Sequence, residues 1–400
     1  MNPQLVAAER RFEVRRAAER WHEAGAIPPE VRDRINAAYA DDRFRVGPVF
    51  RTLLFFFTLI ASWALFGFFL TVTNFAFENA QEIGTVCLLL GGLLLGLGEL
   101  LRSQRFRFAR AGVEEAGTLL GFAWLVAAVC YWISANAPDG SRSFPVWTFL
   151  VLLTAGSGFL IWRTGLPVLG ALGACGALGL LARLPAGRAL WVLAGFALGA
   201  WLLRLAASPQ LAPSQRRAGL FAVATLLTGA YVAIHLGSLD VGLVEILGGR
   251  ATLGTQRTVS PLGRQVSIVA MALYPLAILA WAFGRRHRLL LWLGLGSAIA
   301  SLVTLRVYVQ LAPLWVVLTV SGALLIALAL AARRYLHHGL DHERRGWTAE
   351  PLFESEQARA LLEAALSVTT LAPEARPPDA PKPFEGQGGD FGGGGASGTF

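Results

Sequence analysis

Residues 50–73 read FRTLLFFFTLIASWALFGFFLTVT, and no charged side chain follows Arg51 in this stretch. A helix needs about 20 apolar residues to cross the hydrocarbon layer of a bilayer, so the stretch predicts a transmembrane helix. It begins too far from Met1 to be the apolar core of a signal peptide. We therefore expect it to act as an uncleaved signal-anchor and to be the first of several spans.

The composition of the whole chain agrees with a membrane location. The chain is 54% hydrophobic and 15% charged, whereas soluble domains are about 25% charged. A soluble fold of this size could not remove so much apolar surface from water. The net charge of +9 does not indicate nucleic-acid binding, because the arginines lie between the apolar runs rather than on one basic face. We expect a lipid bilayer, and no nucleic acid, as a partner.

The apolar runs predict an all-α fold, a polytopic transmembrane helix bundle of about ten spans. Glycines recur within the second and fifth runs, and this is typical of helix faces that pack closely. These glycines are Gly91, Gly92, Gly96 and Gly98, and then Gly170, Gly173 and Gly176. The spans are expected near 50–73, 82–101, 114–134, 144–162, 166–183, 188–207, 216–237, 265–284, 288–306 and 311–333.

Arginines in alternate loops predict the orientation of these spans. Cytoplasmic loops carry an excess of Lys and Arg. The arginine-rich loops all lie on one side of the predicted bundle. With ten spans, both termini lie on that same side. The longest loop on the other side is 238–264. We expect both termini in the cytoplasm of a bacterial cell and the protein in its inner membrane. The arginines on the inner side are Arg102, Arg105, Arg107, Arg110, Arg163, Arg216, Arg217, Arg285, Arg286, Arg288, Arg333 and Arg334.

The two ends of the chain differ from the apolar middle, residues 48–334. Residues 1–47 are expected to form a small cytoplasmic helical hairpin, because apolar side chains recur there at helical spacing and Gly25, Pro28 and Pro29 separate two stretches. Residues 335–371 are expected to be cytoplasmic and partly helical. Residues 372–400 are rich in proline and glycine, which predicts a disordered tail.

Two short segments resemble known bacterial membrane proteins. The segment 21–30 reads WHEAGAIPPE and is followed by Ile35, Tyr39 and many spans. It resembles the N-terminal hairpin of the uncharacterised DUF2157 type, although Pro28 stands where a serine or threonine cap is more usual. The last ten residues, FGGGGASGTF, resemble the glycine-rich tail of TPM-domain membrane proteins. The resemblances imply no catalytic residues; the tail implies at most a shared docking or handling step.

Polar residues near the outer ends of the spans are the candidate ligand site. Arg306 and Tyr308 end the ninth span, and Arg250 and Arg264 belong to the long outer loop. Together they suit a phosphate or carboxylate at a membrane surface. His235, one helical turn after Tyr231, could bind a metal or move protons, although an interfacial tyrosine–histidine belt explains the pair as well.

Charged residues at the inner ends of the spans favour a structural interpretation. Glu99 is expected to pair with Arg102 at the end of the second span. Glu114 and Glu115 open the third span and face the arginines of 102–110 across a short loop, which predicts a salt-bridge network rather than a proton relay.

No metal site, cofactor or catalytic residue is predicted. His337, His338 and His342 have a metal-like spacing without a cysteine, so zinc there is the less favoured interpretation. Cys87, Cys130 and Cys175 lie in apolar runs and are expected to be buried small hydrophobic residues. The chain has no Walker motif, no zinc-protease motif and no nucleophile elbow.

Two functions therefore compete at the level of sequence. The first is a non-enzymatic envelope or scaffold protein whose cytoplasmic hairpin and glycine-rich tail recruit protein partners or a second copy of the chain. The alternative is a transporter, or a protein handling lipid or an anionic substrate, that uses the outer arginines. A membrane-bound transferase stays open as well.

Overall fold

The computed structural model falls into two units, Met1–Leu311 and Ala312–Phe400, which are treated separately. In the first unit it describes residues 3–40, 43–72, 80–103, 105–108, 111–136, 143–208, 210–247, 249, 260–285 and 287–309. In the second unit it describes scattered positions between 316 and 348, including a pair of two-residue strands, Glu343–Arg344 (β1) and Trp347–Thr348 (β2). The predicted tail, 372–400, and the three histidines of 337–342 lie outside the described residues.

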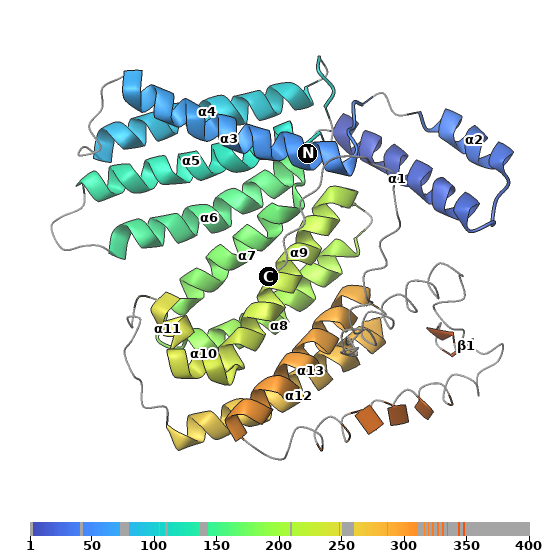
Figure 1. Cartoon of the computed structure of the whole chain (residues 1–400), viewed down its shortest axis with the longest axis vertical. Helices are drawn as coiled ribbons and strands as arrows, with labels where there is room; N and C mark the ends of the chain where they lie inside the picture. Colours follow the sequence, from blue (N-terminus) through green and yellow to red (C-terminus); the bar gives the residue numbers. More distant parts are fainter. Residues whose placement is uncertain are drawn as a thin grey trace, which may run out of the picture. The chain divides into compact units, whose positions relative to one another are not determined.

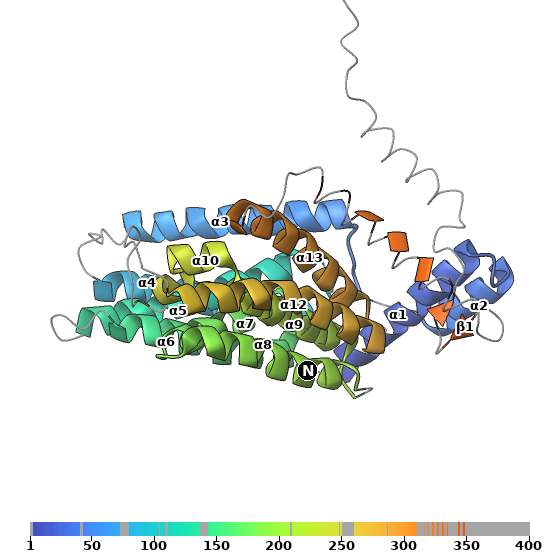
Figure 2. The same ribbon diagram turned by 90° about the horizontal axis from the view of Figure 1, so that it is seen from below.

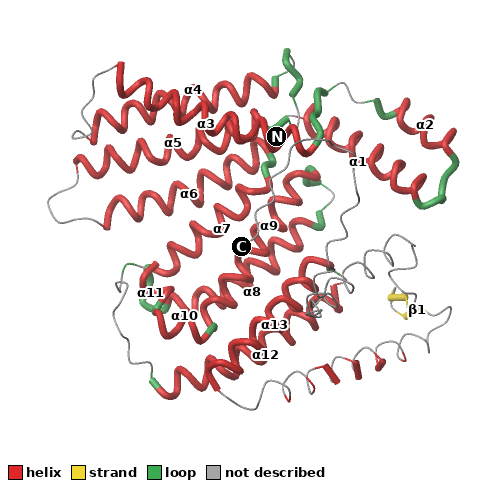
Figure 3. The backbone as a smooth tube through the Cα atoms, viewed as in Figure 1, coloured by secondary structure: helices red, strands yellow, loops and turns green. Residues whose placement is uncertain are grey.

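The described part of the first unit is almost entirely helical, as Figure 3 shows, and this confirms the predicted fold class. The helices lie side by side and connect through short segments (Figure 1). They are α1 (Pro3–Glu23), α2 (Pro29–Ala38), α3 (Pro48–Val72), α4 (Ala80–Arg102), α5 (Val113–Asn136), α6 (Ser143–Thr164), α7 (Pro167–Ala182), α8 (Gly187–Ala206), α9 (Pro213–Ile234), α10 (Leu236–Val241), α11 (Leu243–Leu247), α12 (Pro261–Arg285) and α13 (Arg288–Val309).

Eight of the described helices are long and apolar enough to cross a membrane: α3, α4, α5, α6, α8, α9, α12 and α13. The protein is therefore a helical membrane protein. The predicted fifth span corresponds to α7, which has 16 residues and is apolar but shorter than the other spans. Most of the predicted tenth span, 311–333, lies outside the residues that the structure describes.

Glycines allow α4 and α5 to pack closely. Gly84, Gly91 and Gly98 recur every seven residues on α4, and a Cβ atom at each would meet atoms of α5 within 3.2 Å. The prediction of a close-packed glycine face on this span is confirmed for Gly91 and Gly98. It is wrong for Gly92 and Gly96, which have no such neighbour within 4 Å, because they lie on other sides of the helix.

The glycines of α7 pack as predicted. A Cβ atom at Gly170 would collide with the backbone oxygen of Ala218 in α9. Gly173 and Gly176 face Ser157 and Thr154 of α6. These close approaches place α7 between α6 and α9.

The antiparallel helices give the bundle two ends, which we name by the small helices found there. The α1 end holds the first residues of α3, α5, α7 and α9, together with α1 itself; the α10 end holds α10 and α11. Figure 2 shows α1 and α2 beyond the ends of the spans. The two helices form the hairpin predicted for 1–47, and α2 has no buried residue.

Candidate functional site

A polar cavity of about 160 Å³ lies at the α1 end of the bundle. It is bounded by the first turns of α3, α5 and α9, the last turn of α4, the connection between α6 and α7, and α1. Seven charged side chains line it: Glu9, Arg45, Arg51, Arg102, Glu114, Glu115 and Arg217. Such a concentration of charge beside apolar spans makes this cavity the candidate functional site.

Gly112 brings α3 against α5 at the cavity. Its φ is +96°, a conformation that only glycine adopts without strain. A Cβ atom at this position would collide with the backbone oxygen of Arg51. The absence of a side chain therefore permits the first turn of α3 to lie directly on the start of α5.

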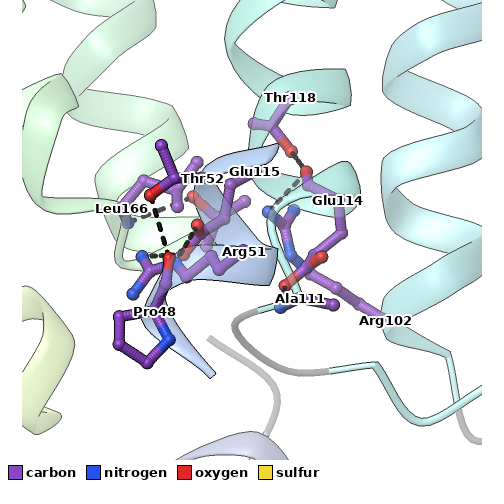
Figure 4. Close-up of polar contacts among 10 residues, drawn as sticks. Pro48, Arg51, Thr52, Arg102, Ala111, Glu114, Glu115, Thr118 and Leu166 are labelled. Atoms are coloured by element: carbon purple, nitrogen blue, oxygen red, sulfur yellow. Dashed lines mark hydrogen bonds and ion pairs between the residues drawn. The ribbon is translucent and has the colours of Figure 1, made fainter. Parts of the chain in front are cut away.

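Arg51 and Glu115 form a two-bond ion pair across this contact (Figure 4). Arg51 Nε donates to Glu115 Oε2 at 2.7 Å, and Nη2 donates to Oε1 at 2.6 Å. The arginine side chain is 40% exposed and the glutamate 13% exposed. The fork geometry fixes both side chains at the boundary between the cavity and the apolar surface.

Glu114 points the other way and is almost completely buried, at 1% exposure. Its Oε1 accepts the backbone N–H of Ala111 at 2.9 Å. Its backbone oxygen accepts from Arg102 Nη2 at 2.9 Å and from Thr118 Oγ1 at 2.8 Å, and Figure 4 shows this arrangement. Among the residues described, Glu114 Oε2 and Arg102 Nη1 are buried and have no hydrogen-bond partner.

Helix α1 closes the cavity from outside the bundle. Glu9 Oε2 accepts the backbone N–H of Ser214 at 3.2 Å, which satisfies one of the open donors at the start of α9. Glu13 accepts a hydrogen bond from Arg217 at 2.8 Å, and the Arg45 guanidinium lies 3.9 Å from the centre of the Phe12 ring. These contacts join α1 and the segment before α3 to the bundle.

The cavity combines both signs of charge. Four arginines and three glutamates line it, and the positive ends of the α3, α5, α7 and α9 dipoles lie at the same end of the bundle. Chemically, this set can bind an anionic group through arginine and can accept hydrogen bonds through Glu114.

The sequence predicted part of this network. An ion pair is confirmed for Glu115, but its partner is Arg51 rather than an arginine of 102–110. Glu114 accepts a hydrogen bond from Arg102 at its backbone oxygen, not at its carboxylate. The expected Glu99–Arg102 pair is wrong: Glu99 pairs with Arg163 of α6, at 3.2 Å. The reason is that Arg102 turns toward α5, whereas the end of α6 brings Arg163 to Glu99.

The predicted outer residues lie at the α10 end. His235 Nδ1 accepts the backbone N–H of Gly237 at 3.1 Å, so Nε2 carries the proton and donates to Thr304 Oγ1 at 2.8 Å. Burial lowers the pKa of His235 below its ordinary value. The phenol oxygen of Tyr308 is 3.2 Å from where a Cβ of Gly237 would lie. His235 and Tyr308 therefore lie at one place, where α9, α10 and α13 meet.

The structure describes two of the three arginines of that predicted site. Arg264 is exposed in the first turn of α12, and Arg306 is half-buried in the last turn of α13. The two helices are antiparallel, so both arginines are at the α10 end. Arg250 lies outside the described residues. A ligand site built from these arginines stays a prediction.

Tyr231 and His235 contact each other and helix α13, and the predicted interfacial belt stays a prediction. Their rings are in edge contact with centroids 5.6 Å apart. Tyr231 hydrogen-bonds Ser301 at 3.1 Å, as His235 does Thr304. Both side chains therefore connect α9 to α13 inside the bundle.

Sequence reasoning missed one buried ion pair at the α10 end, between Arg188 of α8 and Glu245 of α11. Their side chains are 20% and 10% exposed. The available signal was the arginine at the start of the predicted sixth span, in a connection expected on the arginine-poor side. An arginine there needs a partner or access to the interface.

The cysteines and metal ligands give no second site in the part of the chain that is described. No group of three or more His, Cys, Asp or Glu residues there could hold a metal ion. Cys87 is buried and Cys130 is half-buried, as expected of small hydrophobic residues, whereas Cys175 is exposed on the apolar surface of α7.

Comparison with known proteins gives no relative from which a role could be transferred. No family model, no curated protein and no solved structure matches this chain.

Proposed function

We propose that this chain is an integral protein of the bacterial inner membrane, with both termini in the cytoplasm, that binds a small charged ligand in the cavity at its α1 end. The arginine asymmetry of the loops supports this orientation, which places the cavity on the cytoplasmic side. The protein acts by binding and presenting the ligand rather than by catalysis.

One observation carries the proposal: Glu114 Oε2 and Arg102 Nη1 are buried in the wall of one cavity without hydrogen-bond partners among the described residues. Buried polar groups are normally paired, and unpaired ones are costly. Membrane proteins retain charged groups at such positions where they bind or move a ligand. A bound ligand that pairs both atoms offsets this cost.

The test uses the purified full-length protein in detergent and four probes: inorganic phosphate, glycine, phosphoethanolamine and phosphatidylethanolamine. We expect at least one probe to raise the thermal unfolding midpoint and to bind with an affinity that Arg102→Gln lowers about tenfold, the loss expected for one charged hydrogen bond. Arg163→Gln is the matched control, because Arg163 ends a neighbouring helix and does not line the cavity. Binding of none of the probes, or equal effects of the two variants, contradicts the proposal.

A second candidate function is recruitment of a protein partner by the α1–α2 hairpin, in line with the resemblance of 21–30 to the DUF2157 type. The specific observation is that Trp21 and Tyr39 of this hairpin are 52% and 43% exposed. Aromatic side chains on a mixed-charge surface are typical of protein contacts. Crosslinking from a photoreactive residue at the exposed position 23 tests it, and a product formed equally well after Trp21→Ser and Tyr39→Ser would argue against the hairpin as the contact.

A further inference from the structure

The unpaired atoms in the cavity wall define the ligand that would pair with them. Arg102 Nη1 is a donor and Glu114 Oε2 is an acceptor, and both are buried. A single ligand that satisfies both must accept a hydrogen bond from a guanidinium and donate one to a carboxylate. This requirement excludes a simple anion without N–H or O–H groups, and it excludes a simple cation.

The charges around the two atoms narrow the choice to a zwitterion. A cation alone would face Arg45, Arg51 and Arg217 as well as Arg102, and a fully ionised anion would face Glu114. A molecule that carries both a phosphate or carboxylate and an ammonium group can put each charge against its opposite.

A second hollow continues from the cavity along the outside of the bundle. It has a volume of about 280 Å³ and shares Arg51, Glu115, Leu166 and Pro167 with the cavity. Beyond these residues its wall is mainly apolar and comes from three helices: Thr52 and Phe55 of α3, Leu119 of α5 and Val168 of α7. We call this hollow the α3–α7 groove.

The α3–α7 groove lies on the surface that faces lipid. Val168 is 48% exposed, and α3 is the least buried of the long apolar helices. Leu119 of α5 also lines the groove. A molecule with its polar head in the cavity can therefore lay a hydrocarbon chain in the groove, which a soluble amino acid cannot do.

We propose that the cavity and the α3–α7 groove together bind one phospholipid whose head carries a primary ammonium group, that is, a lipid of the phosphatidylethanolamine class. The phosphate accepts hydrogen bonds from Arg102, and the ammonium donates to Glu114 Oε2. One acyl chain occupies the groove between α3 and α7. This assignment rests on the proposed function and names its ligand.

The headgroup requirement is tested by native mass spectrometry of the delipidated full-length protein with three lipids of equal chain length. Phosphatidylcholine has a quaternary ammonium without N–H, and phosphatidylglycerol has no ammonium. We expect one phosphatidylethanolamine to bind with an affinity about tenfold above either, the difference expected for one charge-assisted hydrogen bond. Equal binding of phosphatidylethanolamine and phosphatidylcholine overturns the proposal, and this comparison needs no variant.

Variants locate the two parts of the site. Glu114→Gln should abolish the preference for phosphatidylethanolamine over phosphatidylcholine, whereas Glu99→Gln, outside both hollows, should retain it. Val168→Trp should fill the groove and lower lipid binding about tenfold without affecting soluble phosphoethanolamine. Leu193→Trp is its control, because Leu193 is 64% exposed on α8. A preference that survives Glu114→Gln rules out the assigned headgroup contact.

The outcomes separate this inference from the proposed function. If phosphate, glycine or phosphoethanolamine binds in a manner that depends on Arg102 but no lipid does, the lipid assignment is wrong and the ligand-binding function stands. If none of these three soluble probes binds and no lipid binds, both are wrong.

Discussion

Arg188 holds the carboxylate of Glu245 with two hydrogen bonds of 2.8 Å, one from Nε and one from Nη2. Its guanidinium also donates to the backbone oxygens of Ala233 and Ser238, each at 2.9 Å. One side chain at the start of α8 thus joins the end of α9 to α10 and α11. The carbonyl of Ala233 is one of those that the end of α9 leaves open, so the contact also serves as a helix cap.

Removal of this guanidinium should destabilise the protein strongly. Arg188→Ala removes two charged hydrogen bonds from a buried carboxylate, which costs about 3–5 kcal/mol in the free energy of unfolding. Denaturant unfolding in detergent measures it. The control is Arg163→Ala, whose pair with Glu99 has side chains 54% and 43% exposed and should cost about 1 kcal/mol or less. Similar losses in both variants would contradict the burial argument.

Gly112→Ala should separate α3 from α5. The residue has a positive φ, and its new methyl group would collide with the backbone of Arg51, so we expect a loss of about 2 kcal/mol or more. Gly92→Ala is the matched control, because it is helical with no neighbour within 4 Å and should stabilise by about 0.5–1 kcal/mol. The thermal midpoints of the two variants should therefore move in opposite directions.

The Arg51–Glu115 pair should couple measurably in a double-mutant cycle. Arg51→Ala, Glu115→Ala and the double variant should give a coupling free energy of about 1 kcal/mol, the upper part of the range for pairs with one exposed partner. The coupling should weaken in high salt, because the arginine side chain is 40% exposed. A coupling of zero would show that the two side chains do not hold α3 to α5.

Stability should fall in mild acid because of His235. Burial lowers its pKa below the ordinary value of 6.5, so the unfolded chain binds the proton more readily than the folded one. The contribution of neutral His235 to the free energy of unfolding is therefore fully present above pH 6.5. It is lost as the pH falls from 6.5 through the lower pKa of the folded state. Protonation also ends the acceptance of the Gly237 N–H at Nδ1.

The measurement is the thermal midpoint between about pH 7.5 and pH 5. His235→Gln should reduce its decline. Burial lowers the pKa of His287 as well, so His287→Gln should remove a second part of the decline in the thermal midpoint. The double variant should show the smallest dependence of the midpoint on pH. An unchanged decline in the double variant would show that other groups cause it.

The orientation proposed for the spans can be measured with fusion reporters. A reporter after Arg334 should be active only in the cytoplasm, because positive loops stay inside. A reporter inserted within 137–142, between α5 and α6, should report the opposite side. If both inserts report the same side, the number of spans between them is even, whereas we expect seven.

The sequence predicted the long spans well because length and hydropathy alone decide whether a helix can cross a bilayer. The predicted fifth span, 166–183, differs from α7 by only one residue at each end. Side-chain partners were harder. Arg188 and Glu245 are 57 residues apart, and no spacing rule joins such positions before the helices are packed.

In the candidate site too, local features were predictable from the sequence and side-chain partners from distant helices were not. Acids at the start of α5 were expected to meet arginines, because charge and helix dipole act locally. That Glu115 selects Arg51, or that Glu114 keeps one oxygen unpaired, depends on the close approach at Gly112. This approach follows from tertiary packing, which a single sequence does not encode in any local pattern.

Helix α7 has a further consequence for the lipid around it. Its 16 residues are about 24 Å long, whereas the hydrocarbon of a bilayer is about 30 Å thick. Val168 and Cys175 are exposed, seven residues apart, on one face of it. We expect the bilayer beside that face to be thinner than around the other spans. Such a hydrophobic mismatch would draw the headgroup layer inward next to α7 and form a local dimple in the membrane that the longer helices would not.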